Sequence, residues 1–430
     1  MASAEQLART ILLFQADLGL SSADAVLRAL TYPSVLLVAD AEAMASLSGQ
    51  IAVTTSAMLM ARSGHTVFID APDAPLLGYQ PPLDALTVHE AIAGIDGQLI
   101  EGVQISVGRP LFVPDIAFVF GGGGAGVGVS ARRVVSVGWT AWAGELRDWP
   151  LGPTCTRTEW PMGAMAAAVL VASEAAKITG RILARSSPHR GHYAELFAPS
   201  ASARLALAPD GTPEAANVGS FDIVSAGAVS NALLYALLRV PGIQGEARAF
   251  DRDRSEPSNR NRNVLIVRPF ERLLKVELFE RLSRGLKVRG VPRHFEQSDL
   301  LGAAERIAVG VDDIPTRWML AGARASWMGV GATSHFNAMA SVHYPHSACA
   351  GCLHPHDEDL EGDTPTVAFV SFLAGLLLAA DLLRDVARAD AMLMSRYRYL
   401  TPCQLGGAWE GRVAPTAGCP AKCPASRLRA

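Results

Sequence analysis

Lysine is scarce in this sequence, and neither sign of charge is in excess. Only four of the 430 residues are lysines, and 38 basic against 41 acidic side chains give a formal net charge of −3. A protein that binds nucleic acid normally has a basic face or stripe, so this balance argues against that class. A disordered chain is excluded too, because 50% of the residues are hydrophobic and only 18% are charged.

Long apolar runs and a leader pattern are also missing. The longest charge-free apolar run, 364–380, contains Pro365 and is shorter than the roughly 20 residues that a membrane helix needs. The first 20 residues do not combine a basic start with an unbroken apolar stretch, as a secretory signal would. We therefore expect a cytoplasmic protein that does not bind membranes, with residues 364–380 in a buried helix.

Six cysteines are too few for a disulfide scaffold in a chain of this length. Four of them form two closely spaced pairs, Cys349 with Cys352 and Cys419 with Cys423. Such pairs are typical of a tetrahedral metal site in a reducing compartment, and they predict structural Zn²⁺ that supports folding. The alternatives are a histidine ligand, His354 or His356, or no metal.

One order of predicted elements occurs twice along the chain. A strand-like stretch at 33–40 is followed by a small polar turn, a helical pattern and a second strand that ends at Asp70. The same order begins again at Phe221 and ends at Asp251. Each unit is typical of the first βαβ unit of a parallel sheet, although any α/β protein repeats such units.

The two halves also end alike, with proline-led, small-residue-rich helical patterns at 161–180 and 365–385. We therefore predict an α/β fold of two tandem Rossmann-like domains that form a pseudo-dimer, each a mostly parallel sheet flanked by helices. The predicted domains are residues 1–195 and 196–430. The stretch 186–219 has no sustained apolar period and is interpreted as the linker.

Small residues follow the first predicted strand of the second half. Such a turn lets the backbone approach a phosphate, and Gly227 and Ser230 are its candidate cofactor contacts. Ser225 and Ser230 stand where the usual GxGxxG pattern has glycines, so a purely structural turn is the alternative. Asp251 ends the second strand, where an acid can bind ribose hydroxyls or simply satisfy its own turn.

An arginine-dense polar loop comes next and is followed by a lysine, Lys275. Amides can bind phosphate oxygens, a guanidinium can fork onto a phosphate, and a lysine is a mobile point charge. The loop is therefore suited to a triphosphate, and a solvated surface loop is the alternative. Its candidate cofactor-binding residues are Asp253, Asn259, Asn261 and Arg262.

This segment resembles the ThiF/MoeB/HesA superfamily, the adenylating fold shared with ubiquitin-activating enzymes. The resemblance lies in the turn, Asp251, the Ser258–Asn263 loop with Arg262, and the spacing to Lys275. Arg260 and Asn263 depart from the usual leucine and glutamine. A further strand-like stretch ends in Asp312, with Arg317 five residues on, as the family expects. The resemblance implies ATP as cosubstrate and Mg²⁺ bound by Asp312, with an acidic helix N-cap as the alternative for this stretch.

The activity that the resemblance implies is adenylation of the C-terminal glycine carboxylate of a ubiquitin-like, β-grasp protein. Its catalytic residues would be Arg262 and Lys275, which with Mg²⁺ would neutralise charge on the phosphates, and Asp312, which would hold the Mg²⁺. The family often transfers the acyl group to a cysteine, and Cys403 is the only unpaired cysteine of the second half. It is the candidate nucleophile, with a structural thiol as the alternative.

The first half lacks the loop and the lysine after Asp70. It resembles the inactive half of a fused activating enzyme, and such halves can donate an arginine to the phosphates, for which Arg9 is the candidate. Fused relatives occur beside conjugating enzymes in bacterial antiphage operons, so a conjugating enzyme is an expected partner, with further homodimerisation left open. The alternatives are adenylation of a sulfur carrier or peptide without a thioester, and a non-catalytic scaffold that binds a β-grasp protein.

Overall fold

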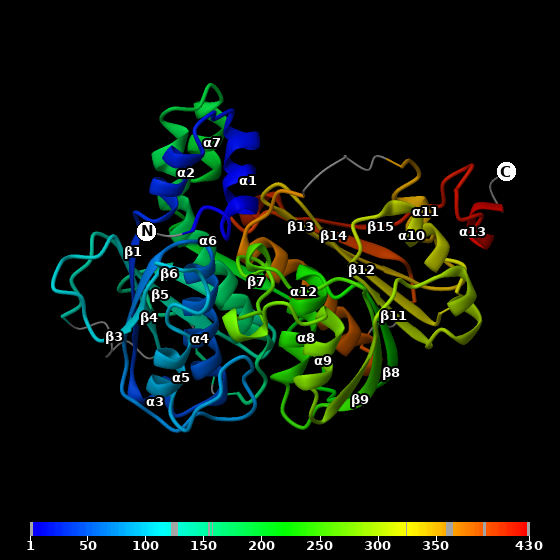
Figure 1. Ribbon diagram of the computed structural model, residues 1–430, viewed down its shortest axis with the longest axis horizontal. Helices are drawn as coiled ribbons and strands as arrows, with labels where there is room; N and C mark the ends of the chain where they lie inside the picture. The colour runs from blue at the N-terminus through cyan, green and yellow to red at the C-terminus, as the bar shows by residue number, and fades with distance from the viewer. Residues whose placement is uncertain are drawn as a thin grey trace.

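The computed structural model describes residues 3–121, 128–153, 155–156, 158–323, 325–357, 364–389 and 393–427. Two α/β units lie side by side, the first coloured blue to green and the second green to red (Figure 1). Each unit is built on one mostly parallel sheet with antiparallel strands at one side. This confirms the predicted fold class.

The first sheet has the strand order β3-β2-β1-β4-β5-β6-β7. Its parallel strands are β1 (Ser34–Ala39), β2 (Thr66–Asp70), β3 (Ile105–Val107), β4 (Ile116–Phe120) and β5 (Val134–Trp139). The antiparallel strands are β6 (Ala143–Asp148) and β7 (Ser202–Ala206).

The second sheet has the order β10-β9-β8-β11-β12-β13-β14-β15. Its parallel strands are β8 (Asn217–Val224), β9 (Gln244–Phe250), β10 (Leu286–Val291), β11 (Arg306–Val309) and β12 (Trp327–Ser334). The antiparallel strands are β13 (Asn337–His343), β14 (Arg396–Leu400) and β15 (Trp409–Arg412). When β8 is matched to β1, the order of the first sheet is repeated and extended by β15.

The helices follow the same repeat. In the first unit they are α1 (Ala8–Leu18), α2 (Ala23–Leu30), α3 (Ala41–Met44), α4 (Leu47–Arg62), α5 (Val88–Ile95), α6 (Met162–Ala184) and α7 (Arg190–Leu196). In the second unit they are α8 (Ala228–Leu238), α9 (Lys275–Arg281), α10 (Ile314–Leu320), α11 (Ala350–Leu353), α12 (Ala368–Val386) and α13 (Pro424–Arg427). The expected closing helices at 161–180 and 365–385 correspond to α6 and α12.

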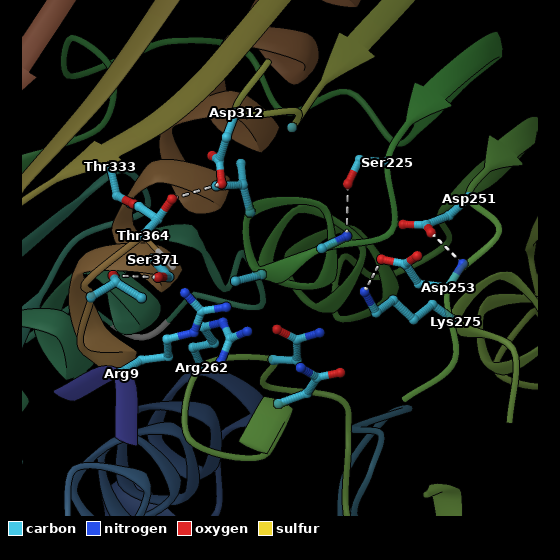
Figure 2. A pocket seen from close by; sticks show the side chains of 17 residues that line it. Arg9, Ser225, Asp251, Asp253, Arg262, Lys275, Asp312, Thr333, Thr364 and Ser371 are labelled. Carbon is cyan, nitrogen blue, oxygen red and sulfur yellow. Dashed lines mark hydrogen bonds and ion pairs between the residues drawn. The ribbon is translucent and has the colours of Figure 1, made fainter. Parts of the chain in front are cut away.

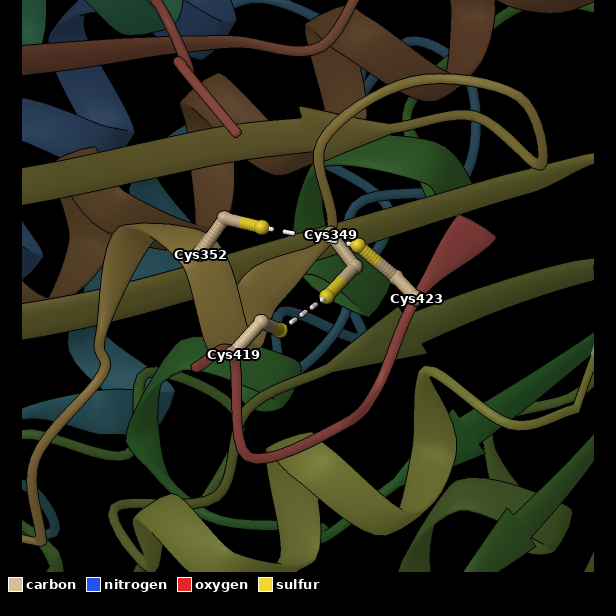
Figure 3. A group of neighbouring side chains, drawn as sticks. All are labelled: Cys349, Cys352, Cys419 and Cys423. Atoms are coloured by element: carbon tan, nitrogen blue, oxygen red, sulfur yellow. Dashed lines mark hydrogen bonds between the residues drawn. The ribbon is translucent and has the colours of Figure 1, made fainter. Parts of the chain in front are cut away.

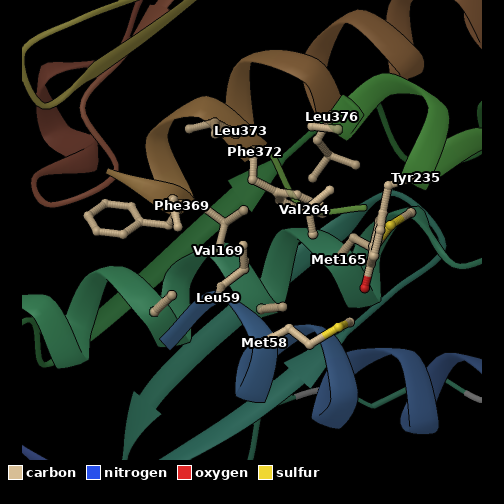
Figure 4. Close-up of a cluster of buried hydrophobic side chains, with 14 of the residues drawn as sticks. Met58, Leu59, Met165, Val169, Tyr235, Val264, Phe369, Phe372, Leu373 and Leu376 are labelled. Atoms are coloured by element: carbon tan, nitrogen blue, oxygen red, sulfur yellow. The ribbon is translucent and has the colours of Figure 1, made fainter. Parts of the chain in front are cut away.

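Apolar helices from both units meet in one shared core (Figure 4). Every residue of α4 is buried; most of its side chains are apolar or small, and the Gln50 amide and the Arg62 guanidinium donate to backbone carbonyls. The Tyr235 hydroxyl of α8 forms a 2.8 Å hydrogen bond with the Thr55 hydroxyl of α4. The core side chains drawn in Figure 4 include Met58, Leu59, Met165, Val169, Tyr235, Phe369, Phe372, Leu373 and Leu376. Burial of this much apolar surface joins the two units in the manner of a dimer interface.

The passage between the units differs from the predicted linker at 186–219 and boundary at 195. α7 lies within that stretch, and β7 pairs with β6 in the first sheet. The chain therefore enters the second sheet only at β8. An edge strand of five residues and a helix of seven are too short to give a clear apolar period, which is why the stretch resembles a linker in sequence.

Among the described helices, α6 is long and apolar enough to cross a membrane, and α1 with α2 passes the same test as a bent pair. The most apolar window of α6 is 94% buried inside the protein, where the helix packs against α4 and β6. Residues 368–384 of α12 are likewise buried, as expected for a core helix.

Candidate functional site

A polar cavity lies at the carboxyl ends of β8, β9 and β11 (Figure 2). The chain leaves β8 in one direction toward β9 and returns on its other side as β11, which makes this the switch point of the sheet. Ligands of open α/β sheets bind at such points. The cavity has a volume of about 260 Å³. Its lining includes the predicted residues Arg9, Gly227, Asp251, Asp253, Asn259, Arg262, Lys275 and Asp312.

The turn after β8 brings backbone N–H groups to the cavity. Ser225 has φ +79°, the left-handed conformation that favours glycine, and its hydroxyl accepts a 3.1 Å hydrogen bond from the Gly227 N–H. Gly227 is the N-cap of α8, and the first helical residues also line the cavity. The N-terminus of this helix of 11 residues therefore faces the cavity, where it would favour an anion.

Ser230 does not line the cavity but is fully buried in α8. A Cβ on Gly310, which follows β11, would lie 2.5 Å from the Ser230 hydroxyl oxygen. Gly310 thus allows α8 to pack closely against the end of β11. In the usual glycine pattern, a glycine within the turn has this role.

The carboxylate of Asp251 orders both the turn and the following loop. Its Oδ2 accepts a 2.7 Å hydrogen bond from the Ala226 N–H, and its Oδ1 accepts one of 2.8 Å from the Asp253 N–H. Asp251 is 6% exposed and lines the cavity. Asp251 can therefore hold the turn and the loop in place and still accept a hydrogen bond from a ribose in the cavity.

Lys275, the first residue of α9, points back toward the loop after β9. Its Nζ lies 2.9 Å from the Asp253 Oδ2. Hydrogen bonding to Lys275 lowers the pKa of Asp253. The lysine side chain is thereby held at the cavity.

Arg262 and Arg9 enter the cavity from opposite halves of the chain (Figure 2). The Arg262 Nη1 donates to the Ser258 carbonyl at 2.8 Å and to the Asn261 Oδ1 at 3.2 Å. Asn261 is fully buried and does not line the cavity; its amide donates to the Thr10 hydroxyl of α1 at 3.4 Å. Since Thr10 follows Arg9, this contact couples the loop to the helix that brings Arg9 to the site.

Asp312 and Asp313 have different roles. Asp312 lines the cavity, and its Oδ2 accepts a 3.2 Å hydrogen bond from the Thr364 hydroxyl. Asp313 is the N-cap of α10 and accepts from the Thr316 N–H. The helix-cap interpretation therefore holds for Asp313, while Asp312 offers the kind of carboxylate oxygen that Mg²⁺ prefers. The Arg317 guanidinium donates to the Val311 carbonyl and does not line the cavity.

Hydroxyl groups complete the cavity on the side of Asp312, and sequence reasoning did not identify them. Thr366 and Ser371 share a 2.8 Å hydrogen bond between their hydroxyls. These side chains come from β12, α12 and the segment before α12, and no motif marks them in the sequence. The residues are Thr333, Thr364, Thr366 and Ser371.

Cys403 lies elsewhere. It lines a different cavity between the units, together with Ser173 and Glu174, and is 2% exposed. Burial raises the pKa of its thiol to about 12. The structure thus does not bring Cys403 to the cavity that holds Lys275, and at neutral pH its thiol is protonated.

The four paired cysteines converge as predicted (Figure 3). Their sulfur atoms all lie within 4.8 Å of one another, and the closest pairs, Cys349 with Cys419 and Cys352 with Cys423, are 3.5 Å apart. Tetrahedral zinc with Zn–S bonds of about 2.3 Å separates its sulfurs by roughly 3.8 Å, so this cluster is compatible with Zn²⁺. It joins α11 to the segment before α13.

Comparisons with known proteins give one family match and several structural likenesses. The model of the BilD N-terminal domain matches residues 34–190, and none of the residues that line the cavity falls in that span. No curated protein matches the sequence.

Three solved structures are representative. E. coli MccB with succinimide has 16% identity and a TM-score of 0.38, covering 45% of this chain. PaaA has 14% identity and a TM-score of 0.36, also covering 45%. E. coli MccB with AMPCPP and MccA has 12% identity and a TM-score of 0.39, covering 65% of this chain and 95% of its own. In the first two matches this chain spans 64% of the other chain's length. Similarities at this level of identity and TM-score do not indicate the activity of this chain.

Proposed function

We propose that this chain is a ubiquitin-activating-like adenylating enzyme of the ThiF/MoeB/HesA type, which uses ATP to activate the C-terminal carboxylate of a ubiquitin-like, β-grasp protein. The observation that carries the proposal is the shared cavity. It gathers an acid after each of the two strands that flank β8, Asp251 after β9 and Asp312 after β11, together with Arg262 and Lys275. Residues of these types, at the switch point of a parallel sheet, suit a nucleoside triphosphate.

Each residue has a role in holding the nucleotide. The N–H groups of Gly227 and the first turn of α8 bind phosphate oxygens, and Asp251 accepts hydrogen bonds from the ribose. Arg262 and Lys275 carry positive charge to the phosphates, with Arg9 added from the first half. Asp312 would hold Mg²⁺, which neutralises charge on the β- and γ-phosphates when it is bound.

The reaction is a displacement at the α-phosphorus. An oxygen of the substrate carboxylate forms a bond to the α-phosphorus, and the bond from that phosphorus to the α,β-bridging oxygen breaks. Pyrophosphate leaves with the electron pair, and the product is a mixed anhydride of the carboxylate and AMP. The side chains do no covalent chemistry in this step; they align the two reactants and stabilise the growing negative charge.

The first half of the chain acts as an inactive partner fused to the active half. It supplies Arg9 and packs α4 and α6 against α12. None of its other described residues lines the cavity. A single chain thereby contains what separate subunits of a homodimer would provide.

The product is passed on without an enzyme-bound thioester in this proposal. None of the six cysteines lines the cavity, and the Cys403 thiol is buried and protonated. The acyl-adenylate would then react with the thiol of a separate conjugating enzyme, as in a bacterial antiphage pathway. The buried Cys403 equally supports the second candidate, adenylation of a sulfur carrier or peptide.

ATP–pyrophosphate exchange tests the activity. The assay uses a small β-grasp protein that ends in glycine and, as its control, the same protein without that residue. We expect the wild-type enzyme to catalyse exchange only with the substrate whose C-terminus is intact. The variants Lys275→Ala and Asp312→Ala should catalyse no exchange with either substrate. A folded chain that binds the β-grasp protein but shows no exchange would instead be a scaffold.

A further inference from the structure

A second cavity of about 720 Å³ lies in the first unit, at the opposite end of the strands from a nucleotide site. α2, α6 and the residues just before β4 and β5 enclose it. These strands begin at Ile116 and Val134, so the cavity sits at the amino end of the first sheet. None of its lining residues belongs to the cavity of Lys275.

Five arginines line this cavity in a chain whose net charge is −3. Two of them are committed to carboxylates. Arg133 donates to Asp148 at 2.7 Å and to Glu174 at 2.5 Å, and Arg132 lies 3.2 Å from Asp115. These pairs account for the acidic side chains around the cavity.

The other three arginines, Arg28, Arg181 and Arg185, have no carboxylate partner among the described residues. Arg181 is half-buried and donates to the Phe197 carbonyl at 3.0 Å. Burial lowers the pKa of Arg181; the nearby Glu174 carboxylate favours its protonation, and the charges of Arg133 and Arg185 oppose it. Like charges brought together in this way are costly unless an anion lies between them.

The ends of two helices explain part of this arrangement. Arg28 is in the last turn of α2 and Arg181 in the last turn of α6, where C-terminal carbonyls favour cations. That preference places single cations at helix ends. It does not gather arginines from two helices and a loop around one hollow.

We propose that this cavity binds a phosphate-bearing small molecule. Guanidinium groups fork onto phosphate oxygens, and three arginines without an ion-pair partner among the described residues suit a dianion or polyanion with its charge concentrated at one point. The volume is within the range of small-molecule sites, roughly 300–1,000 Å³. Apolar side chains between the arginines would contact an uncharged part of the ligand; they are Ala25, Ala29, Ile178 and Ile182.

An acidic peptide is the less favoured ligand. A peptide presents carboxylates spaced along an extended chain, and it would be matched by a row of arginines. Here the arginines line one hollow from different elements, together with Tyr32 and Asp115. The proposal does not rest on the adenylating function, because the two cavities share no residue.

Calorimetric titration of the full chain with inorganic pyrophosphate and with AMP tests the proposal. The variant is Arg28→Gln/Arg185→Gln, which removes two exposed arginines without disturbing the core. Its matched control is Arg190→Gln/Arg412→Gln, the same charge change at exposed arginines that do not line the cavity. Lys275→Ala separates this site from the first cavity.

We expect wild type to bind one or both probes at one such site per chain. In Arg28→Gln/Arg185→Gln the dissociation constant of that site should be at least tenfold higher. The control and Lys275→Ala keep that site, and ATP–pyrophosphate exchange is unchanged in Arg28→Gln/Arg185→Gln. Binding of both probes that is the same in the variant and the control would overturn the proposal. A second result would also overturn the proposal: hexaglutamate binds wild type more tightly than either probe does, and this binding is lost in Arg28→Gln/Arg185→Gln. That result would identify a site for an acidic peptide.

Discussion

The Arg62 guanidinium, from the first half of the chain, donates a hydrogen bond to the Arg260 backbone carbonyl in the second half. It also donates to the Val264 carbonyl at 2.8 Å and to the Ile266 carbonyl at 3.0 Å. Arg62 is fully buried, and burial lowers its pKa to about 9, so it remains protonated at neutral pH. The loop that carries Asn259 and Arg262 is therefore held in shape by the first half of the chain.

Replacement of Arg62 by lysine tests this relationship. An ammonium group cannot reach three carbonyls that a planar fork satisfies, so at least one is left without a donor. We expect Arg62→Lys to lower the free energy of unfolding by about 2–4 kcal/mol in urea titrations. ATP should also bind at least tenfold more weakly at temperatures where the variant is folded. Arg190→Lys, at an exposed position outside both cavities, is the control and should change neither quantity. Equal ATP affinity in wild type and Arg62→Lys would show that the loop does not depend on Arg62.

The cysteine cluster predicts one bound zinc per chain. Elemental analysis of the purified protein should find it, and Cys352→Ser/Cys423→Ser should lose it together with several degrees of thermal stability. The control is Cys155→Ser, which changes a cysteine outside the cluster. A chain that contains no zinc when it is purified without chelators, and is as stable as the double variant, would show that the cysteines pack without metal.

His65 predicts a loss of stability in mild acid. It is fully buried, its Nδ1 lies 3.0 Å from the Leu30 carbonyl, and burial lowers its pKa from 6.5 to about 4. The unfolded chain binds the proton at higher pH than the folded chain does, so stability falls as the pH drops from about 6.5 toward 4. Between pH 7 and pH 5 this amounts to about 2 kcal/mol. The urea midpoint of His65→Gln should therefore depend less on pH than that of wild type; identical slopes would contradict the assignment.

The burial of Cys403 predicts that its thiol does not react in the folded protein, as expected for a structural thiol and not for a nucleophile. Because its pKa is raised to about 12, iodoacetamide should not modify it in the folded protein at pH 7. Cys403→Ala should retain ATP–pyrophosphate exchange. It should also give the same adducts with a β-grasp substrate on non-reducing gels. Loss of a thiol-sensitive adduct in this variant would restore Cys403 as the thioester cysteine.

Sequence patterns predicted the residues that lie at strand ends and missed those that tertiary packing brings in. Asp251 and Asp312 follow predicted strands, and Lys275 stands out because lysine is rare here, so each has a local signal. Thr333 and Ser371 have none, because a hydroxyl on a strand or core helix is common and only packing directs it into the cavity. Arg62 is similar: its partners are backbone carbonyls, which no side-chain pattern reveals.

The same limit applies to the fold. The two βαβ units were predictable because apolar strands and helices alternate with small polar turns. The position of β7 was not, because its pairing with β6 depends on the edge of a sheet already formed. The different positions of the Asp312 and Asp313 side chains also depend on where α10 begins. The N-cap position directs the Asp313 carboxylate to the helix and leaves the Asp312 carboxylate at the cavity.

Binding of Mg·ATP in the absence of any protein substrate tests the central claim most directly. Calorimetry should give one magnesium-dependent site per chain, with Asp312 as the magnesium ligand, and ATP should bind this site at least tenfold more weakly in Lys275→Ala and in Arg262→Gln. Arg281→Gln, an exposed arginine on α9 outside the cavity, should bind as wild type does. Equal ATP affinity in wild type, Lys275→Ala and Arg262→Gln would contradict the account, because the triphosphate would then bind somewhere else or not at all.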